Sequence, residues 1–181
     1  MAAVALCAAV ASPALAADRP SRTIASADRS FLEKAARGGL AEVELGRLAQ
    51  QNAAEGQVKA FGDRMAAEHG KANSELAAIA KAKGIALPTE PDKEARRQID
   101  KLGGVTGAAF DRAYLNYMVA DHRRDVADFK KQARSGKDAE IKAFAAKTLP
   151  VLEEHLKHAR LAQAGLVEPI RSGDAAATAT R

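Results

Sequence analysis

The chain has 181 residues, with 28 Lys and Arg against 23 Asp and Glu, and it contains no Trp, 2 Tyr and 5 Phe. So few aromatic residues argue against a sheet, whereas the many Ala, Leu, Lys, Arg and Glu residues are typical of helices. A charged fraction of 28% and a mean hydropathy of -0.26 exclude a membrane bundle and a disordered chain as the class of the mature protein.

The first 17 residues predict a signal peptide. They carry no charge, and the apolar run Val4–Val10 is followed by the small residues Ala14 and Ala16 of an A-x-A cleavage pattern. Cleavage near Ala16 or Ala17 would make the protein an exported, periplasmic one. The alternative interpretation is a short apolar helix that the mature chain retains.

Cysteine and apolar content limit the chemistry of the mature chain. Cys7 is the only cysteine and lies within the predicted signal peptide, so disulfides, thiolate metal sites and a cysteine nucleophile are excluded after cleavage. Residues 18–26 are expected to form a polar linker. No later segment approaches the ~20 apolar residues that a membrane span requires, so no transmembrane span is expected.

Four long amphipathic helices and one short helix are predicted after the linker. In chain order they cover about residues 26–52, 55–83, 92–102, 107–134 and 138–164. Gly84 is expected to end the second helix, and Pro150 to kink the last one. The domain therefore covers residues 27–166, and residues 167–181, of low complexity, are expected to form a disordered tail.

The first helix carries two further signals. Ser26 to Asp28 is expected to begin it, with Asp28 as a capping acid. Gly38, Gly39 and Gly46 cost roughly 1 kcal/mol each against alanine inside a helix. These glycines indicate that a neighbouring helix approaches closely, or that room is made around Glu42.

The connections predict the topology. Short turns near residues 53–54 and 135–137 place the helices that they join side by side and antiparallel, whereas about twenty residues separate the second and third long helices. A helix of about 27 residues is ~40 Å long, and this insert can cross that length. The predicted fold is therefore all-α, a ferritin-like four-helix bundle with a long crossover that carries a short helix between long helices two and three.

Each long helix presents one polar residue on its inward face, and the four are Glu42, His69, His122 and His155. At 1.5 Å per residue, these positions fall within a slab of roughly 8 Å. Burying an unpaired carboxylate costs several kcal/mol, so Glu42 requires a cation, a donor or a metal, and imidazole suits iron, zinc or copper. The four residues are therefore candidate metal ligands. The alternative is a metal-free Glu/His network that fixes the register of the helices.

Five neighbouring residues are candidate supports of this cluster. Glu68, Asp121 and Glu154 each precede a histidine and point about 100° away from it, so they are expected to orient the ligands or line the rim. Met65 and Met118 lie one turn before their histidines and are interpreted as core residues, with soft copper ligation as the alternative.

An internal repeat links two of these helices. The segment Phe61–His69 has the same pattern as Tyr114–His122: an aromatic residue, a Met, an acid and a His at identical spacing. The repeat indicates two related helix pairs.

Signatures of enzymes and of nucleic-acid binding are missing from the sequence. It has no G-x-S-x-G, P-loop, G-x-G-x-x-G or H-E-x-x-H, and it lacks the E-x-x-H pairs of di-iron enzymes, so an oxidase or catalase-like activity is the third-ranked hypothesis. Basic pairs alternate with acids and lack aromatic partners, which favours a solvated face over a nucleic-acid surface. A basic exported domain is still expected to contact anionic envelope surfaces weakly.

Four runs of the chain carry a resemblance to a known family, and they are Asp28–Gly46, Val58–His69, Gly107–Tyr114 and Met118–His122. On these runs the chain resembles the bacterial exported family catalogued as domain of unknown function 4142, over about residues 27–164. The resemblance implies a ferritin-like bundle in the cell envelope and no established reaction. The residues that match the motif of the family are Glu42, His69, Asp121, His122 and His155.

Together these observations predict a non-enzymatic, exported bundle that binds a metal ion or a small ligand at its Glu/His cluster. The alternative is a structural or interaction module of the envelope in which the same residues form a metal-free network.

Overall fold

The computed structural model describes residues 24–165, so the predicted signal peptide, most of the linker and the predicted tail from residue 167 lie outside the described residues. The described chain folds into five helices and contains no strand: α1 (Ser26–Asn52), α2 (Gly56–Ala82), α3 (Lys93–Gly103), α4 (Gly107–Ser135) and α5 (Ala139–Gln163). The predicted all-α class is confirmed, and no helix begins or ends more than one residue from its predicted position.

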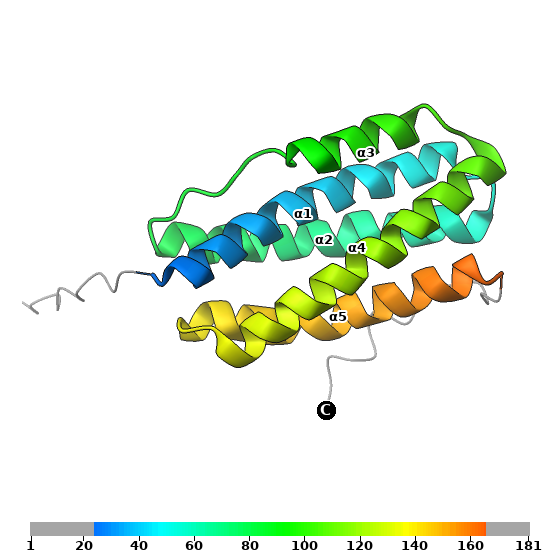
Figure 1. Cartoon of the computed structure of the whole chain (residues 1–181). Coiled ribbons are helices and arrows are strands. Elements are labelled where there is room, and N and C mark those ends of the chain that lie inside the picture. Colours follow the sequence, from blue (N-terminus) through cyan, green and yellow to red (C-terminus); the bar gives the residue numbers. More distant parts are fainter. Residues whose placement is uncertain (1–23, 166–181) are drawn as a thin grey trace, which may run out of the picture.

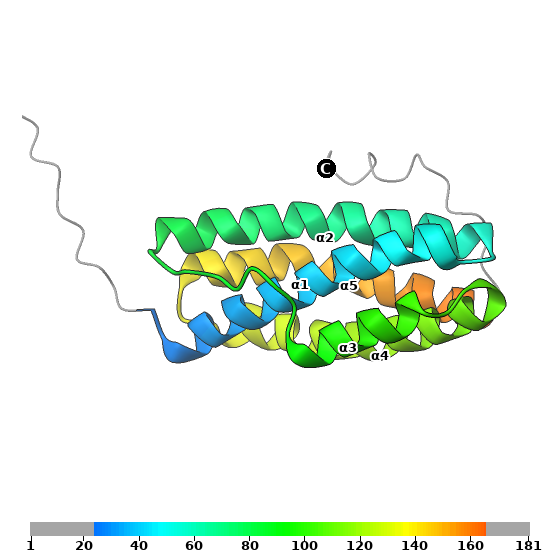
Figure 2. The ribbon, with the colours of Figure 1, turned by 90° about the horizontal axis from the view of Figure 1, so that it is seen from above.

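The bundle consists of two helical hairpins, α1–α2 and α4–α5, which pack against each other (Figure 1). The chain between α2 and α4 runs back along the bundle, so that α2 and α4 point in the same direction (Figures 1 and 2). This is the one-crossover topology of ferritin-like bundles that the long insert predicted. Packing is most extensive within each hairpin and sparser between the hairpins.

The short helix α3 holds the crossover against α1. Asp92 caps α3, because its side chain accepts hydrogen bonds from the backbone N–H groups of Glu94 and Ala95. Further along α3, the apolar side chains of Ile99 and Leu102 are buried.

Glycine allows the two helices of the first hairpin to approach closely. A Cβ atom at Gly46 would lie 2.5 Å from the backbone oxygen of Gly62 and 2.9 Å from the backbone nitrogen of Ala66. An alanine at position 46 would therefore have to separate α1 from α2. Gly39 has a tight neighbour in Asn73, whereas the space beside Gly38 is open, so the expected close approach holds for two of the three glycines.

Two buried carboxylates tie each hairpin to the turn of the other. The sequence suggested that Asp28 caps α1, and this was wrong. Its carboxylate instead accepts hydrogen bonds from the backbone N–H groups of Lys137 and Asp138 in the α4–α5 turn. At the opposite end, Asp111 of α4 accepts from two backbone N–H groups of the α1–α2 turn. Charge-assisted bonds of this kind hold the two hairpins together at both ends of the bundle.

The sequence predicted that Gly84 ends α2 and that Pro150 lies within α5 and kinks it. Gly84 follows α2 with a φ of 65°, a left-handed conformation that glycine adopts without strain, so the predicted end is confirmed. Pro150 lies inside α5 without ending it.

The apolar core is divided into two clusters by a polar layer. One cluster includes Leu45, Met65, Met118 and Leu156; the other includes Leu32, Leu76, Phe129 and Leu152. In α2, α4 and α5 the histidine of the Glu/His cluster lies between residues of the two apolar clusters, and in α1 Glu42 directly follows Ala41, at the border between them. The fold therefore places four polar side chains at the middle of the bundle.

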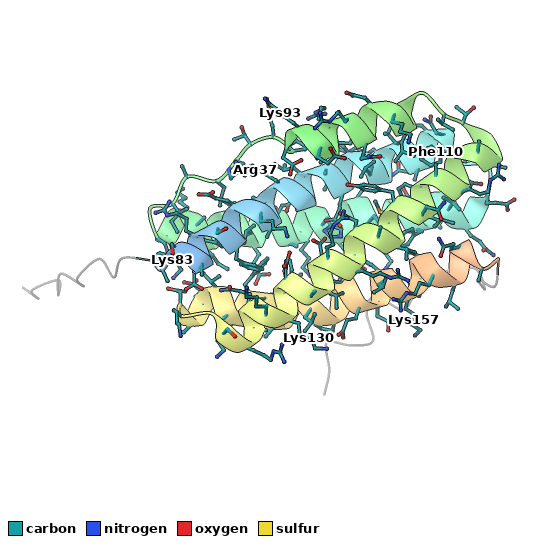
Figure 3. The ribbon with its side chains drawn as sticks, viewed as in Figure 1. Arg37, Lys83, Lys93, Phe110, Lys130 and Lys157 are labelled. Atoms are coloured by element: carbon teal, nitrogen blue, oxygen red, sulfur yellow. The ribbon has the colours of Figure 1, made fainter. Side chains whose placement is uncertain are left out.

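Charged side chains cover the outside of the bundle (Figure 3). Lys93, Lys130 and Lys157 point away from it on three different helices, with no single basic face among them. In the part of the chain from residue 24 to 165, no helix is long and apolar enough to cross a membrane.

Candidate metal centre

Each hairpin contributes two of the four inward polar residues. Glu42 of α1 and His69 of α2 come from the first hairpin, and His122 of α4 and His155 of α5 come from the second. All four side chains are at most 7% exposed. His69 and His122 lie about 20 Å and 22 Å along two helices that run in the same direction, at 1.5 Å per residue, which explains why the internal repeat brings them together.

His69 is oriented by Glu42. Its Nδ1 lies 2.9 Å from the Oε2 atom of Glu42, which is the distance of a charge-assisted hydrogen bond. A proton on Nδ1 leaves the lone pair of the neutral ring on Nε2. This second nitrogen of His69 is buried and has no hydrogen-bond partner.

His155 is oriented in the same way by Glu68. The Nε2 atom of the ring lies 2.6 Å from the Oε2 atom of Glu68, so Nε2 carries the proton and Nδ1 carries the lone pair. Arg64 holds this carboxylate in turn, through a bond of 3.0 Å to its other oxygen. On the inner side, Nδ1 of His155 lies 3.3 Å from Nε2 of His122.

The three imidazoles converge on one point. One nitrogen from each of His69, His122 and His155 lies within 4.8 Å of the nitrogens of the other two. The ring centroids are 5.2 to 5.6 Å apart. Three neutral imidazoles in this arrangement form the nitrogen ligand set that zinc and copper favour.

Burial keeps these imidazoles neutral. It lowers the pKa of His69 to about 4 against the opposing effect of nearby carboxylates. It also lowers the pKa of His155 to about 4, although the hydrogen bond to Glu68 acts in the opposite direction. For His122, burial and the neighbouring His69 and His155 hold the pKa well below its usual value. No proton therefore has to leave the ligand atoms at neutral pH.

A second group of ligand atoms lies on the side of the cluster between α1 and α4. Oxygens of Glu42 and Asp121 and a nitrogen of His122 lie within 4.8 Å of one another. Asp125, one turn after Asp121 on α4, is within hydrogen-bonding reach of Glu42. Burial, followed by the nearby Asp121, raises the pKa of Glu42 well above its usual value, and burial, Glu42 and Asp121 do the same for Asp125.

Asp125 was missed by the sequence reasoning. Its position three residues after His122 and four after Asp121 puts it on the same side of α4 as both, and this spacing is the signal that could have revealed it.

The supporting residues predicted from the sequence have different positions. Glu68 and Asp121 border the cluster, and Met65 and Met118 are fully buried in one apolar cluster, as their interpretation as core residues predicted. Glu154 is not at the cluster; it lies half exposed on α5 and pairs with Lys157. Because Glu154 directly precedes His155 on α5, its side chain points outward. Glu68 contacts the same histidine from α2 instead.

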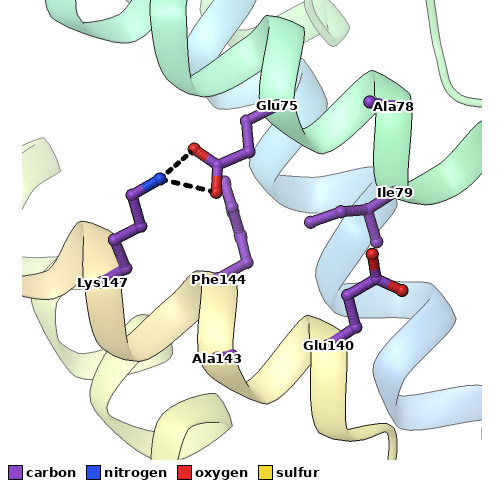
Figure 4. A pocket seen from close by; sticks show the side chains of 7 residues that line it. All are labelled: Glu75, Ala78, Ile79, Glu140, Ala143, Phe144 and Lys147. Atoms are coloured by element: carbon purple, nitrogen blue, oxygen red, sulfur yellow. Dashed lines mark hydrogen bonds and ion pairs between the residues drawn. The ribbon is translucent and has the colours of Figure 1, made fainter.

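Two surface cavities lie away from the cluster. One, of about 350 Å³, lies between α2 and α5 beside the ion pair of Glu75 and Lys147, with Ile79 and Phe144 in its wall (Figure 4). The other, of about 650 Å³, lies at the end of the bundle near Asp111 and Gln163. Neither cavity is lined by Glu42, His69, His122 or His155, and all four of these residues are buried.

Comparison with known proteins gives a family and a fold. The sequence model of a family described as "Domain of unknown function (DUF4142)" matches residues 12–161. Among solved structures, the "Crystal structure of DUF305 fragment from Deinococcus radiodurans" is similar, with a TM-score of 0.69 and 13% identity, over 79% of this chain and 99% of that one. At this identity the likeness shows the helical fold alone. No curated protein matches the chain.

Proposed function

The chain belongs to the DUF4142 family, whose description assigns no activity, and from the geometry of its core we propose that it binds one transition-metal ion through His69, His122 and His155. The supporting observation is the convergence of three buried, neutral imidazoles, each with a nitrogen available to a common centre. Glu42 and Glu68 hold the rings of His69 and His155 through the opposite nitrogens. Such carboxylate–histidine pairs accompany metal ligands widely.

The distances are close to those of a tetrahedral site. Ligand nitrogens bound to zinc at about 2.0–2.1 Å are separated by about 3.4 Å around a tetrahedron. The nitrogens of His122 and His155 are already 3.3 Å apart. The nitrogen of His69 lies within 4.8 Å of both, so a shift of at most about 1.4 Å completes the triangle and leaves a fourth position for water.

Unsatisfied polar atoms favour a metal over a metal-free network. The network satisfies one nitrogen of His69 and one oxygen of Glu42, but Nε2 of His69 has no hydrogen-bond partner, and Oε1 of Glu42 has none unless a neighbouring carboxyl is protonated. Each buried unsatisfied group costs about 1–3 kcal/mol. A bound cation would satisfy Nε2 directly, which a purely structural network does not.

The nitrogen-rich ligand set favours zinc or copper, with ferrous iron next. We further propose that the protein carries this site in the cell envelope. The support for this location is the sequence of residues 1–17, whose apolar run and A-x-A pattern are typical of a signal peptide.

Equilibrium dialysis of the mature chain against Zn²⁺, followed by elemental analysis, tests the site. We expect one zinc ion per chain in the wild type and none retained in the double variant His69→Ala, His122→Ala. His158→Ala is the matched control, because His158 is the fourth histidine of the chain and contacts Arg64 outside the cluster. Equal zinc content in the wild type and the double variant would contradict the proposal.

A further inference from the structure

On the α1–α4 side of the histidines, the carboxyl groups of Asp121 and Asp125 and one oxygen of Glu42 remain without a role in the proposed zinc site. We propose that Glu42, Asp121 and Asp125 form a second cation site, which takes a hard divalent ion such as Mn²⁺ beside the ion held by the imidazoles. The inference rests on the proposed function for the first ion only.

The two sites divide the atoms of Glu42 between them. Oε2 of Glu42 accepts a hydrogen bond from His69 and orients that ligand, whereas Oε1 lies 3.5 Å from Nε2 of His122. Oε1 is buried and has no hydrogen-bond partner in the described part of the chain. An unpaired carboxylate oxygen in a side chain that is only 2% exposed calls for a cation.

Asp121 and Asp125 complete the oxygen set from α4. One carboxylate oxygen of Asp121 lies within 4.8 Å of one carboxylate oxygen of Glu42, and the carboxyl of Asp125 is within hydrogen-bonding reach of Glu42. Asp121 uses one oxygen, Oδ1, to pair with the exposed Arg124 at 2.6 Å and keeps its other oxygen. Glu42 and Asp121 can therefore offer oxygens to the same place, with the carboxyl of Asp125 beside Glu42.

Lys and Arg side chains do not neutralise Glu42 or Asp125 in the described part of the chain. Within residues 24–165, neither Glu42 nor Asp125 forms an ion pair with Lys or Arg, and Arg124 reaches only Asp121. A divalent ion would supply the positive charge that no Lys or Arg brings to Glu42 and Asp125.

The chemistry of the ligands determines the class of ion. His122 faces both groups, but one nitrogen lone pair serves one ion, so the second ion is left with carboxylate oxygens and water. Oxygen-only sets suit hard cations such as Mg²⁺ and Mn²⁺, whereas the three imidazoles suit zinc or copper. The two sites should therefore take different ions from a mixture.

Titration of zinc-loaded protein with Mn²⁺, followed by the electron paramagnetic resonance signal of free Mn²⁺, tests this inference. We expect the wild type to bind one Mn²⁺ while it retains zinc, and Asp121→Asn with Asp125→Asn to weaken Mn²⁺ binding at least tenfold at unchanged zinc content. The control, Asp63→Asn with Asp100→Asn, removes the same two charges at exposed positions and should bind Mn²⁺ like the wild type.

The outcomes separate this inference from the proposed function. If wild type, double variant and control bind Mn²⁺ equally, or if zinc-loaded wild type binds none, the second site is overturned while the zinc site stands. Absence of zinc from the wild type would contradict the first site, and the Mn²⁺ titration of the zinc-free chain would still test the carboxylates. Circular dichroism of each variant establishes that it is folded before titration.

Discussion

Zinc at a free concentration a thousand times its Kd is expected to raise the free energy of unfolding of the mature chain by about 4 kcal/mol. For a domain of this size, that increase corresponds to a rise of about 10 °C in Tm. The reason is geometric: His69 belongs to one hairpin and His122 and His155 to the other, so a shared ion cross-links hairpins that otherwise pack more sparsely against each other than within themselves.

Thermal unfolding of wild type and His155→Ala, each with and without zinc, measures this effect. The variant loses one of three ligands, so its Tm should rise far less than that of the wild type. His158→Ala should respond to zinc like the wild type. An equal rise in all three proteins would mean that zinc binds elsewhere.

In the absence of metal, the folded chain is expected to lose stability from its histidines as the pH falls below 6.5. Burial lowers the pKa of His69 and of His155 to about 4, whereas the unfolded chain has histidines with a pKa near 6.5. Between these values the unfolded state binds more protons, so unfolding becomes more favourable as the pH falls. Each of the two rings should cost about 2 kcal/mol at pH 5 relative to pH 8.

The carboxyl pair acts in the opposite direction. Because the folded-state pKa of Glu42 and Asp125 is raised, the stability that their protonation contributes is present at low pH and lost as the pH rises. Both the wild type and His155→Asn keep Glu42 and Asp125. The contribution of these two carboxyls therefore cancels when the stabilities of the two proteins are compared.

Urea unfolding of these two proteins at pH 8 and pH 5, with a chelator present, is the measurement. The stability advantage of the wild type should shrink by about 2 kcal/mol on acidification. An advantage that does not change with pH would show that His155 is not held neutral in the folded chain.

Much of the fold could be predicted because local signals and topology agree. The helices and their ends can be recognised from local features, such as helical periodicity and Gly84. The length of the crossover then predicts that α2 and α4 run parallel. The function of Asp28 could not be predicted, because an acid near a helix start looks like a cap whether it bonds its own helix or the α4–α5 turn over a hundred residues away.

The candidate site was predictable as a set of inward residues but not as a set of contacts. Periodicity places Glu42, His69 and His122 on inner faces, yet it does not indicate which atoms meet. That Glu68, rather than Glu154, holds His155 depends on the rotation of α2 against α5. The spacing of Asp125 indicates that it shares a side of α4 with Asp121 and His122, but its approach to Glu42 becomes evident only once α1 is in place.

X-ray absorption spectroscopy of the zinc-loaded chain tests the central claim most directly. We predict a four-coordinate ion with three imidazole nitrogens at about 2.0–2.1 Å and one further light ligand. A spectrum of a six-coordinate ion surrounded by oxygens, without the scattering pattern of imidazole rings, would contradict it.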